Sequence, residues 1–260
     1  MLLKVSRHAH PTNPTATPPL LIDNPNSAIQ NPSVPRLVLF DIDLTLITTT
    51  GAGRTAMESA FTRLWPIDRA TEGVSFDGRT DRGIFIEVLE MHGKGGPELE
   101  ANLARYVEAY LEDLPGSLAS KGGSVLPGVP ELLAALSLEQ PGFGLATGNI
   151  RRGAQAKLGH FGLWDHFVGG GFGDDHAVRA DLVAAGIREL ATRLETDPDP
   201  RNAIVLGDTP LDIEAAHRAG AMALGVGTGR FTAAELLAAG ADYALADLSN
   251  TAHALEILTA

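Results

Sequence analysis

The sequence predicts an α/β protein: a doubly wound, Rossmann-like parallel sheet with an inserted α-helical cap domain. Two observations lead to this fold class. Short apolar runs alternate with helical patterns along most of the chain, and one long stretch of consecutive helices interrupts the alternation. Alternating strands and helices favour right-handed crossovers between parallel strands. The 260 residues are enough for a medium-sized domain with a smaller insertion.

The N-terminal segment, residues 1–35, carries seven prolines among Asn, Thr and Ser and has no lasting periodicity. We therefore expect a flexible tail there. Regular structure is predicted to begin at 36–40, an apolar run suited to a strand buried on both faces of a parallel sheet. Similar runs follow at 143–146, 167–168, 203–206, 221–226 and 243–246.

Helical patterns fill the spaces between these strands, with apolar positions on one side over 132–136 and over 182–194. The stretch 51–124 contains only helical patterns, including a long apolar stripe over 99–114. We therefore assign 51–124 to the helical cap domain. Residues 36–50 and 125–260 then form the α/β core domain, which resumes after a glycine-rich segment.

Composition excludes several classes of function. The chain has no cysteine, so disulfides, thiolate metal sites and cysteine nucleophiles are absent, and a metal would need oxygen or imidazole ligands. The net charge of −12 and the lack of a basic run argue against nucleic acid as a partner. No stretch approaches the ~20 apolar residues that span a bilayer. We expect no membrane partner and a cytoplasmic location.

Two pairs of acidic residues follow predicted strands. Asp41 and Asp43 come after the first strand, and Asp208 and Asp212 come after the strand at 203–206. Ligands bind at the carboxyl ends of strands in such sheets, and closely spaced carboxylates need a cation or hydrogen-bond donors. Mg²⁺ fits this set because it takes few carboxylates and keeps water and substrate oxygens in its shell.

The second pair also has a structural interpretation. Thr209 could be the N-cap of a helix, Pro210 its first residue and Asp212 an acid in its first turn. Capping does not explain Asp208, which precedes the cap. In the same way, one residue of the first pair could simply stabilise a turn.

Two further segments offer phosphate-binding groups. Thr147, Gly148 and Asn149 follow the strand at 143–146 and provide hydroxyl, amide and backbone donors, although the same residues also suit a turn. Arg179 could neutralise a phosphate and donate two parallel hydrogen bonds, whereas an isolated arginine is more often a surface residue.

With these segments in place, the chain resembles the haloacid dehalogenase superfamily, and within it the phosphoglycolate phosphatase-like group, over about 36–246. The first family motif, Asp-x-Asp-x-Thr, matches Asp41, Asp43 and Thr45. The second matches Thr147. The fourth, Gly-Asp-x-x-x-Asp, matches Gly207, Asp208 and Asp212, and the helical insertion occupies the place of the family's cap domain.

The third family motif is the one departure, because it is most often a lysine. Arg179 is the nearest candidate by position, with Arg188 and Arg151 as lesser contenders. The segment 76–81 resembles a cap loop of phosphatase-like relatives, in which Arg79 would bind the non-phosphate end of the substrate or form a structural salt bridge between domains.

The resemblance implies a Mg²⁺-dependent phosphatase acting on a small phosphorylated metabolite, such as phosphoglycolate. Asp41 would attack phosphorus and form an aspartyl-phosphate. Asp43 would protonate the leaving group, and its carbonyl would bind the metal with Asp41 and Asp208, while Asp212 would act directly or through water. Thr147 and Arg179 would hold the other phosphate oxygens.

Two other functions are compatible with the sequence. Asp43 favours phosphate esters over carbon–halogen bonds, since halide leaves without protonation. A phosphosugar mutase similar to β-phosphoglucomutase has the same architecture and would return the phosphate to its substrate. A non-catalytic phosphate-binding regulatory module is the second alternative, and the two acidic residues of the first motif argue against it.

Overall fold

The main sheet has six parallel strands and confirms the predicted fold class. The computed structural model describes residues 36–174, 176 and 178–260, so the predicted tail lies outside the described residues. The strand order is β5-β4-β1-β6-β7-β8, and every neighbouring pair is parallel. The bounds are β1 (Leu37–Phe40), β4 (Gly144–Ala146), β5 (Gly170–Gly171), β6 (Ala203–Gly207), β7 (Met222–Val226) and β8 (Tyr243–Leu245).

Helices cover both faces of the sheet, and successive side chains of each strand point to opposite faces. In β1, Val38 and Phe40 enter one apolar cluster, whereas Leu37 and Leu39 enter another. The first cluster is closed by α4 (Val129–Glu139), α5 (Arg151–His160) and α9 (Thr251–Thr259). The second is closed by α6 (Arg179–Arg193), α7 (Pro210–Arg218) and α8 (Ala233–Ala238). Burial on both faces explains why β1 is a continuous apolar run.

Strand β5 was predicted at 167–168, and that position is wrong. The strand forms at Gly170–Gly171, although Val168 N already donates to Phe143 O over 3.1 Å. A Cβ on Gly171 would lie 1.8 Å from the carbonyl oxygen of Leu182 in α6. Helix α6 therefore packs directly on this strand, and only glycine leaves room for it. Glycine is disfavoured in strands, so β propensity could not reveal this strand in the sequence.

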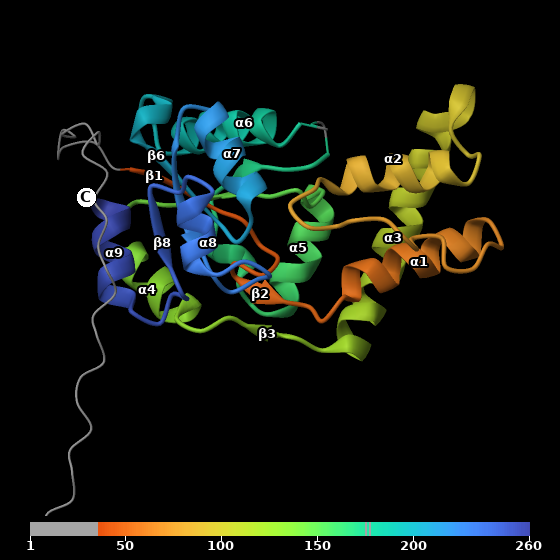
Figure 1. Ribbon diagram of the computed structural model, residues 1–260, viewed down its shortest axis with the longest axis horizontal. Helices are drawn as coiled ribbons and strands as arrows, with labels where there is room; N and C mark the ends of the chain where they lie inside the picture. The colour runs from red at the N-terminus through yellow and green to blue at the C-terminus, as the bar shows by residue number, and fades with distance from the viewer. Residues whose placement is uncertain (1–35, 175, 177) are drawn as a thin grey trace, which may run out of the picture.

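The helical insertion, which we define as residues 52–121, lies beside the sheet on the right of Figure 1. It consists of α1 (Ala52–Leu64), α2 (Asp81–Met91), the short 3-10 helix η1 (Gly96–Glu98) and α3 (Leu99–Lys121). Its own apolar cluster contains Phe61, Phe85, Tyr106 and Tyr110. The aromatic rings pack edge to face, with 4.7 Å between the centroids of Phe85 and Tyr106.

Two short strands join the insertion to the sheet domain. The entering segment, β2 (Ile47–Thr48), pairs antiparallel with the returning segment, β3 (Ser124–Val125). The two crossings of the chain therefore run side by side and fix the insertion close to the carboxyl end of β1. In the part of the chain that the structure describes, no helix has the length and apolar character needed to cross a membrane.

Candidate active site

The two predicted acidic pairs lie together because their strands are neighbours. Strands β1 and β6 pair in register, with Phe40 opposite Leu206, and Asp41 N donates to Leu206 O over 2.9 Å. One carboxylate oxygen from each of Asp41, Asp208 and Asp212 lies within 4.8 Å of the others, and all three residues are buried. We call these three residues the carboxylate cluster.

Asp212 belongs to the cluster and also starts helix α7. Thr209 is the N-cap, and its Oγ1 accepts a hydrogen bond from Asp212 N. In return, Asp212 Oδ2 accepts from Thr209 N over 3.0 Å and from Thr209 Oγ1 over 2.7 Å, which completes a capping box. A Cβ on Gly207 would lie 2.3 Å from Asp212 Cγ, so this turn requires glycine. The capping interpretation and membership of the cluster are therefore both correct.

The cluster carries more negative charge than its surroundings neutralise. Burial, opposed by Arg179 and reinforced by Asp212 and Asp43, raises the pKa of Asp41 to about 7. Burial together with repulsion from Asp212 and Asp41 raises the pKa of Asp208 to about 8. The pKa of a carboxyl group rises in this way when burial and neighbouring negative charge outweigh the cations around it. The cluster therefore favours an added positive ion.

The oxygen atoms of the cluster fit a hard divalent cation. Oδ2 of Asp212 is engaged by Thr209 and Oδ1 by Arg179, so Asp41 and Asp208 are the better placed direct ligands. A Cβ on Gly229 would lie 1.8 Å from Asp208 Oδ2, which shows that the backbone after β7 covers this carboxylate closely. The Asp43 carboxylate faces elsewhere, so only its carbonyl could join a metal shell.

Arg179, the first residue of α6, reaches the candidate nucleophile. Its Nη2 lies 3.1 Å from Asp41 Oδ1 and also pairs with Asp212, and the side chain is only 10% exposed. Attraction by Asp212 and Asp41 outweighs burial and raises the arginine pKa. The other two contenders lie elsewhere: Arg188 is exposed on α6, and Arg151 stacks over the ring of Phe172 at 4.1 Å.

The segment after β4 presents a fully buried hydroxyl. Thr147 Oγ1 accepts hydrogen bonds from Asn149 N over 3.3 Å and from Asn149 Nδ2 over 2.8 Å. Because both contacts use the oxygen as an acceptor, the hydroxyl proton remains to be donated. A Cβ on Gly148 would lie 2.1 Å from Arg79 O, and Asp81 N donates to Gly148 O over 2.7 Å. The insertion therefore docks on this segment through its backbone.

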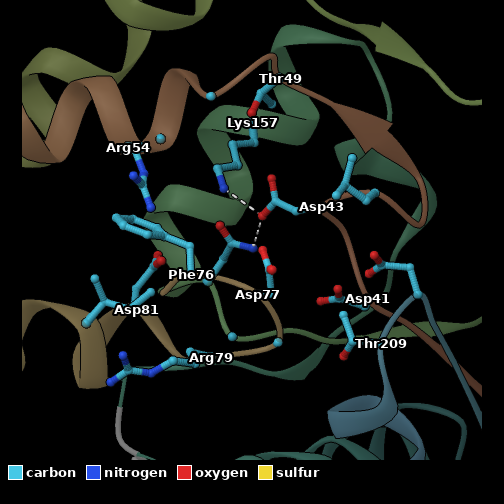
Figure 2. Close-up of a pocket in the computed structure, with 18 of the residues that line it drawn as sticks. Asp41, Asp43, Thr49, Arg54, Phe76, Asp77, Arg79, Asp81, Lys157 and Thr209 are labelled. Carbon is cyan, nitrogen blue, oxygen red and sulfur yellow. Dashed lines mark hydrogen bonds and ion pairs between the residues drawn. The ribbon is translucent and has the colours of Figure 1, made fainter. Parts of the chain in front are cut away.

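Asp43 contacts a lysine that sequence reasoning missed. Lys157 Nζ donates to Asp43 Oδ2 over 2.7 Å, and Asn149 Nδ2 donates to the same oxygen over 2.8 Å. Burial opposes the charge on Lys157, but Asp43 and Asp81 outweigh it and raise the lysine pKa. The available signal was a cation on the apolar side of α5, next to buried Ala154 and Leu158. Figure 2 shows the contact between Lys157 and Asp43.

A cavity of about 320 Å³ separates the ends of the strands from the helical insertion. Figure 2 shows Asp41 and Asp43 on its sheet side and Arg54, Phe76 and Arg79 on its insertion side. Arg54 lies 4.2 Å from the centre of the Phe76 ring and donates to Val74 O. Arg54 was not singled out from the sequence, because an arginine near the start of a helix is an ordinary surface pattern.

Arg79 lines the same cavity but already has a carboxylate partner. Its guanidinium pairs with Glu87 of α2, eight residues further along the chain. The ion pair lies within the insertion and does not bridge it to the sheet domain. Asp81 does contact the sheet domain, because its Oδ2 accepts from Ile150 N over 3.0 Å. Burial raises the pKa of Asp81 to about 6.

Comparison with known proteins identifies the family of this chain. Residues 38–226 match the haloacid dehalogenase-like hydrolase family. A phosphoglycolate phosphatase of Rhodospirillum rubrum is 30% identical over 72% of this chain and 77% of its own. A validoxylamine A 7'-phosphate phosphatase of Streptomyces hygroscopicus subsp. limoneus is 31% identical over 74% of this chain and 86% of its own.

Solved structures agree on the fold. A hydrolase from Pseudomonas syringae superposes with a TM-score of 0.63 at 22% identity, covering 86% of this chain and 100% of the other. A β-phosphoglucomutase from Clostridium difficile superposes with a TM-score of 0.60 at 18% identity, covering 84% of this chain and 93% of the other. From the match over most of the sheet domain and insertion, the chain belongs to the haloacid dehalogenase-like hydrolase family and is a phosphoric monoester hydrolase.

Proposed function

We propose that the protein is a Mg²⁺-dependent phosphatase that cleaves a small-molecule phosphomonoester through an aspartyl-phosphate on Asp41. The position of Asp41 carries this proposal. Its carboxylate belongs to the carboxylate cluster, contacts Arg179 and lines the cavity. A phosphate in the cavity would therefore meet the nucleophile and a cation together, beside Gly148 and Asn149 of the segment that follows Thr147.

Asp43 would exchange the proton in this reaction. It lies two residues after Asp41 and lines the cavity across from the insertion, so it would face a leaving group that extends from the phosphate towards the insertion. As the phosphorus–oxygen bond breaks, Asp43 gives its proton to the ester oxygen, and it then takes a proton from the water that hydrolyses the aspartyl-phosphate. Alkyl phosphates need this proton, because an alkoxide is a poor leaving group.

Mg²⁺ would be held by the carboxylates of Asp41 and Asp208 and by the carbonyl of Asp43. Asp212, with both oxygens engaged, would act through a water molecule and keep Arg179 in place. The ion would supply positive charge to the transferring phosphoryl group. Chelation with EDTA should therefore abolish turnover and added Mg²⁺ should restore it; full activity in EDTA would overturn the metal assignment.

The nucleophile is tested by trapping it. Enzyme mixed with substrate and quenched in acid should gain the mass of one phosphoryl group. This phosphoryl label should be lost in hydroxylamine, and peptide mapping should place it on Asp41. Asp41→Asn should fold, gain no label and lack turnover. Substantial activity in this variant, or a label on another residue, would remove Asp41 as the nucleophile.

The substrate is proposed to be short and to carry a second negative charge, as phosphoglycolate does. One relative is named a phosphoglycolate phosphatase, and the cavity is near the lower end of the range for small-molecule sites. Arg54 is held by Val74 O and Phe76, neither of which neutralises it, so it can pair with a substrate carboxylate. Arg79 is the weaker candidate because Glu87 already neutralises it.

A panel of phosphorylated metabolites, assayed with and without Mg²⁺, tests this substrate class. Phosphoglycolate should be preferred over ethyl phosphate, an analogue without the carboxylate, and Arg54→Met should raise KM for phosphoglycolate while leaving KM for ethyl phosphate nearly unchanged. Equal effects on both substrates would contradict the role of Arg54. Isomerisation of a sugar phosphate without phosphate release would identify a mutase, and absence of turnover on the whole panel would favour the regulatory alternative.

A further inference from the structure

Lys157 is the buried cation of the site that the proposed mechanism does not use. It lies on α5, eight residues after Asn149, and its ammonium group reaches Asp43 across 114 residues of sequence. Its side chain is 7% exposed, whereas that of Asp43 is 40% exposed towards the cavity. A buried ammonium is costly unless it is paired, so the contact with Asp43 is needed to hold Lys157 in this position.

The contacts of Lys157 fix one particular oxygen of Asp43. Both donors, Lys157 Nζ and Asn149 Nδ2, act on Oδ2 at 2.7 and 2.8 Å. Two donors on one oxygen set the rotation of the carboxyl group, so Oδ1 is the oxygen that remains for proton exchange with a leaving group. Asn149 also donates to Thr147 Oγ1, so the same amide links Asp43 to the phosphate-binding segment.

Each of the three α-helices of the insertion contributes a residue near this ammonium group. A Cβ on Gly53 of α1 would lie 3.5 Å from Nζ and 4.0 Å from the hydroxyl of Tyr110 in α3. Asp81, the first residue of α2, attracts Lys157 electrostatically and holds the insertion on Ile150 N. The lysine is therefore enclosed only when the insertion is docked as it is here.

We propose that Lys157 is a positioning residue that holds Asp43 so that Oδ1 faces the ester oxygen of the substrate. The inference rests on the proposed function, because it assigns Lys157 to the proton step of Asp43. A purely structural lysine would stabilise the fold and affect all substrates alike. A positioning lysine instead matters in proportion to how much the leaving group needs a proton.

The test compares leaving groups in Lys157→Met. With p-nitrophenyl phosphate, whose leaving group departs without a proton, kcat/KM should fall less than about fivefold. With propyl phosphate, which needs the proton and has no second charge to bind the lysine, it should fall about 10²-fold or more. Lys157→Arg, which keeps a cationic donor, should recover part of the propyl phosphate activity. Equal losses with both substrates would overturn the proposal.

Three further variants separate the possible failures. Leu158→Ala removes the buried apolar residue next to Lys157, whose side chain lies in the apolar cluster of the sheet domain, so it should lower Tm and leave the ratio of kcat/KM for the two substrates unchanged. Asp43→Asn should show the same leaving-group dependence as Lys157→Met; if it does not, the proposed function itself fails. On the Asp43→Asn background, Lys157→Met should change the rate with phenyl phosphate by less than about twofold, and a full additional loss would refute the coupling.

If Lys157→Met does not fold, Lys157→Gln serves as the second variant, since it keeps a polar head in the buried site and lacks the charge. The criteria are the same: a loss that is selective for propyl phosphate supports the positioning role, and an equal loss for both substrates overturns it.

Discussion

Replacing Arg179 by methionine should destabilise the protein when no metal is bound. Arg179 is 10% exposed and compensates Asp41 and Asp212, so Arg179→Met leaves two buried carboxylates without their cation. Removing one partner of a buried pair costs about 3 to 5 kcal/mol of unfolding free energy. For a domain of this size that corresponds to a fall in Tm of about 6 to 20 °C, measurable by circular dichroism in EDTA.

The pH dependence of this loss has a definite sign. Arg179 lowers the pKa of Asp41 and of Asp208, so its removal raises both further above the ordinary value of 3.8. A carboxyl group whose folded pKa is raised contributes stability that is present below its unfolded pKa and is lost as pH rises through the folded pKa. The difference in Tm between Arg179→Met and the wild type should therefore grow from pH 5 to pH 8.5.

Arg188→Met is the matched control, because Arg188 lies exposed on the same helix and its loss should shift Tm by no more than about 2 °C. Mg²⁺ should recover part of the stability of Arg179→Met, since it places a new cation beside Asp41. An Arg179→Met protein that melts within about 2 °C of the wild type in EDTA at pH 8 would refute the reasoning. So would a difference in Tm that shrinks as pH rises.

Two other outcomes are expected. Thr147→Ala should lower kcat about 10² to 10³-fold, equivalent to about 3 to 4 kcal/mol, because its hydroxyl proton would be aimed at the transferring phosphate; Thr147→Ser should keep most activity, and a loss confined to Tm would indicate a structural hydroxyl. Apparent Mg²⁺ affinity should rise from pH 6 to pH 9, because Asp41 and Asp208, with pKa values of about 7 and about 8, must lose their protons. Calorimetry in buffers of different ionisation enthalpy should detect proton release on binding, and its absence would contradict the ligand assignment.

The sequence predicted the parts of the site whose position depends on neighbouring residues along the chain. Asp41 and Asp208 each follow an apolar strand, and parallel strands place their carboxyl ends on one edge of the sheet. The capping box at Thr209 and Asp212 is equally local, since it depends on a spacing of three residues. These features need no knowledge of packing beyond the parallel sheet.

The tertiary structure decided which residues far apart in sequence come together in the site. Three arginines could have filled the third motif, and the packing of α6 on the sheet brings Arg179 to Asp41. Strand β5 lies at Gly170–Gly171 because α6 approaches it too closely for any side chain. Arg54 enters the cavity only because the insertion folds over the carboxyl end of the sheet.

Asp43 and Lys157 illustrate the boundary between the two kinds of information. The motif around Asp43 is visible in six residues of sequence, whereas Lys157 is one lysine on a helix with no local signal of a partner. Local sequence determined which carboxylates stand at the strand ends, since chain connectivity fixes them there. Packing of helix, sheet and insertion decided which cations reach those carboxylates. The contact between Lys157 and Asp43, for example, spans 114 residues and exists only in the folded chain.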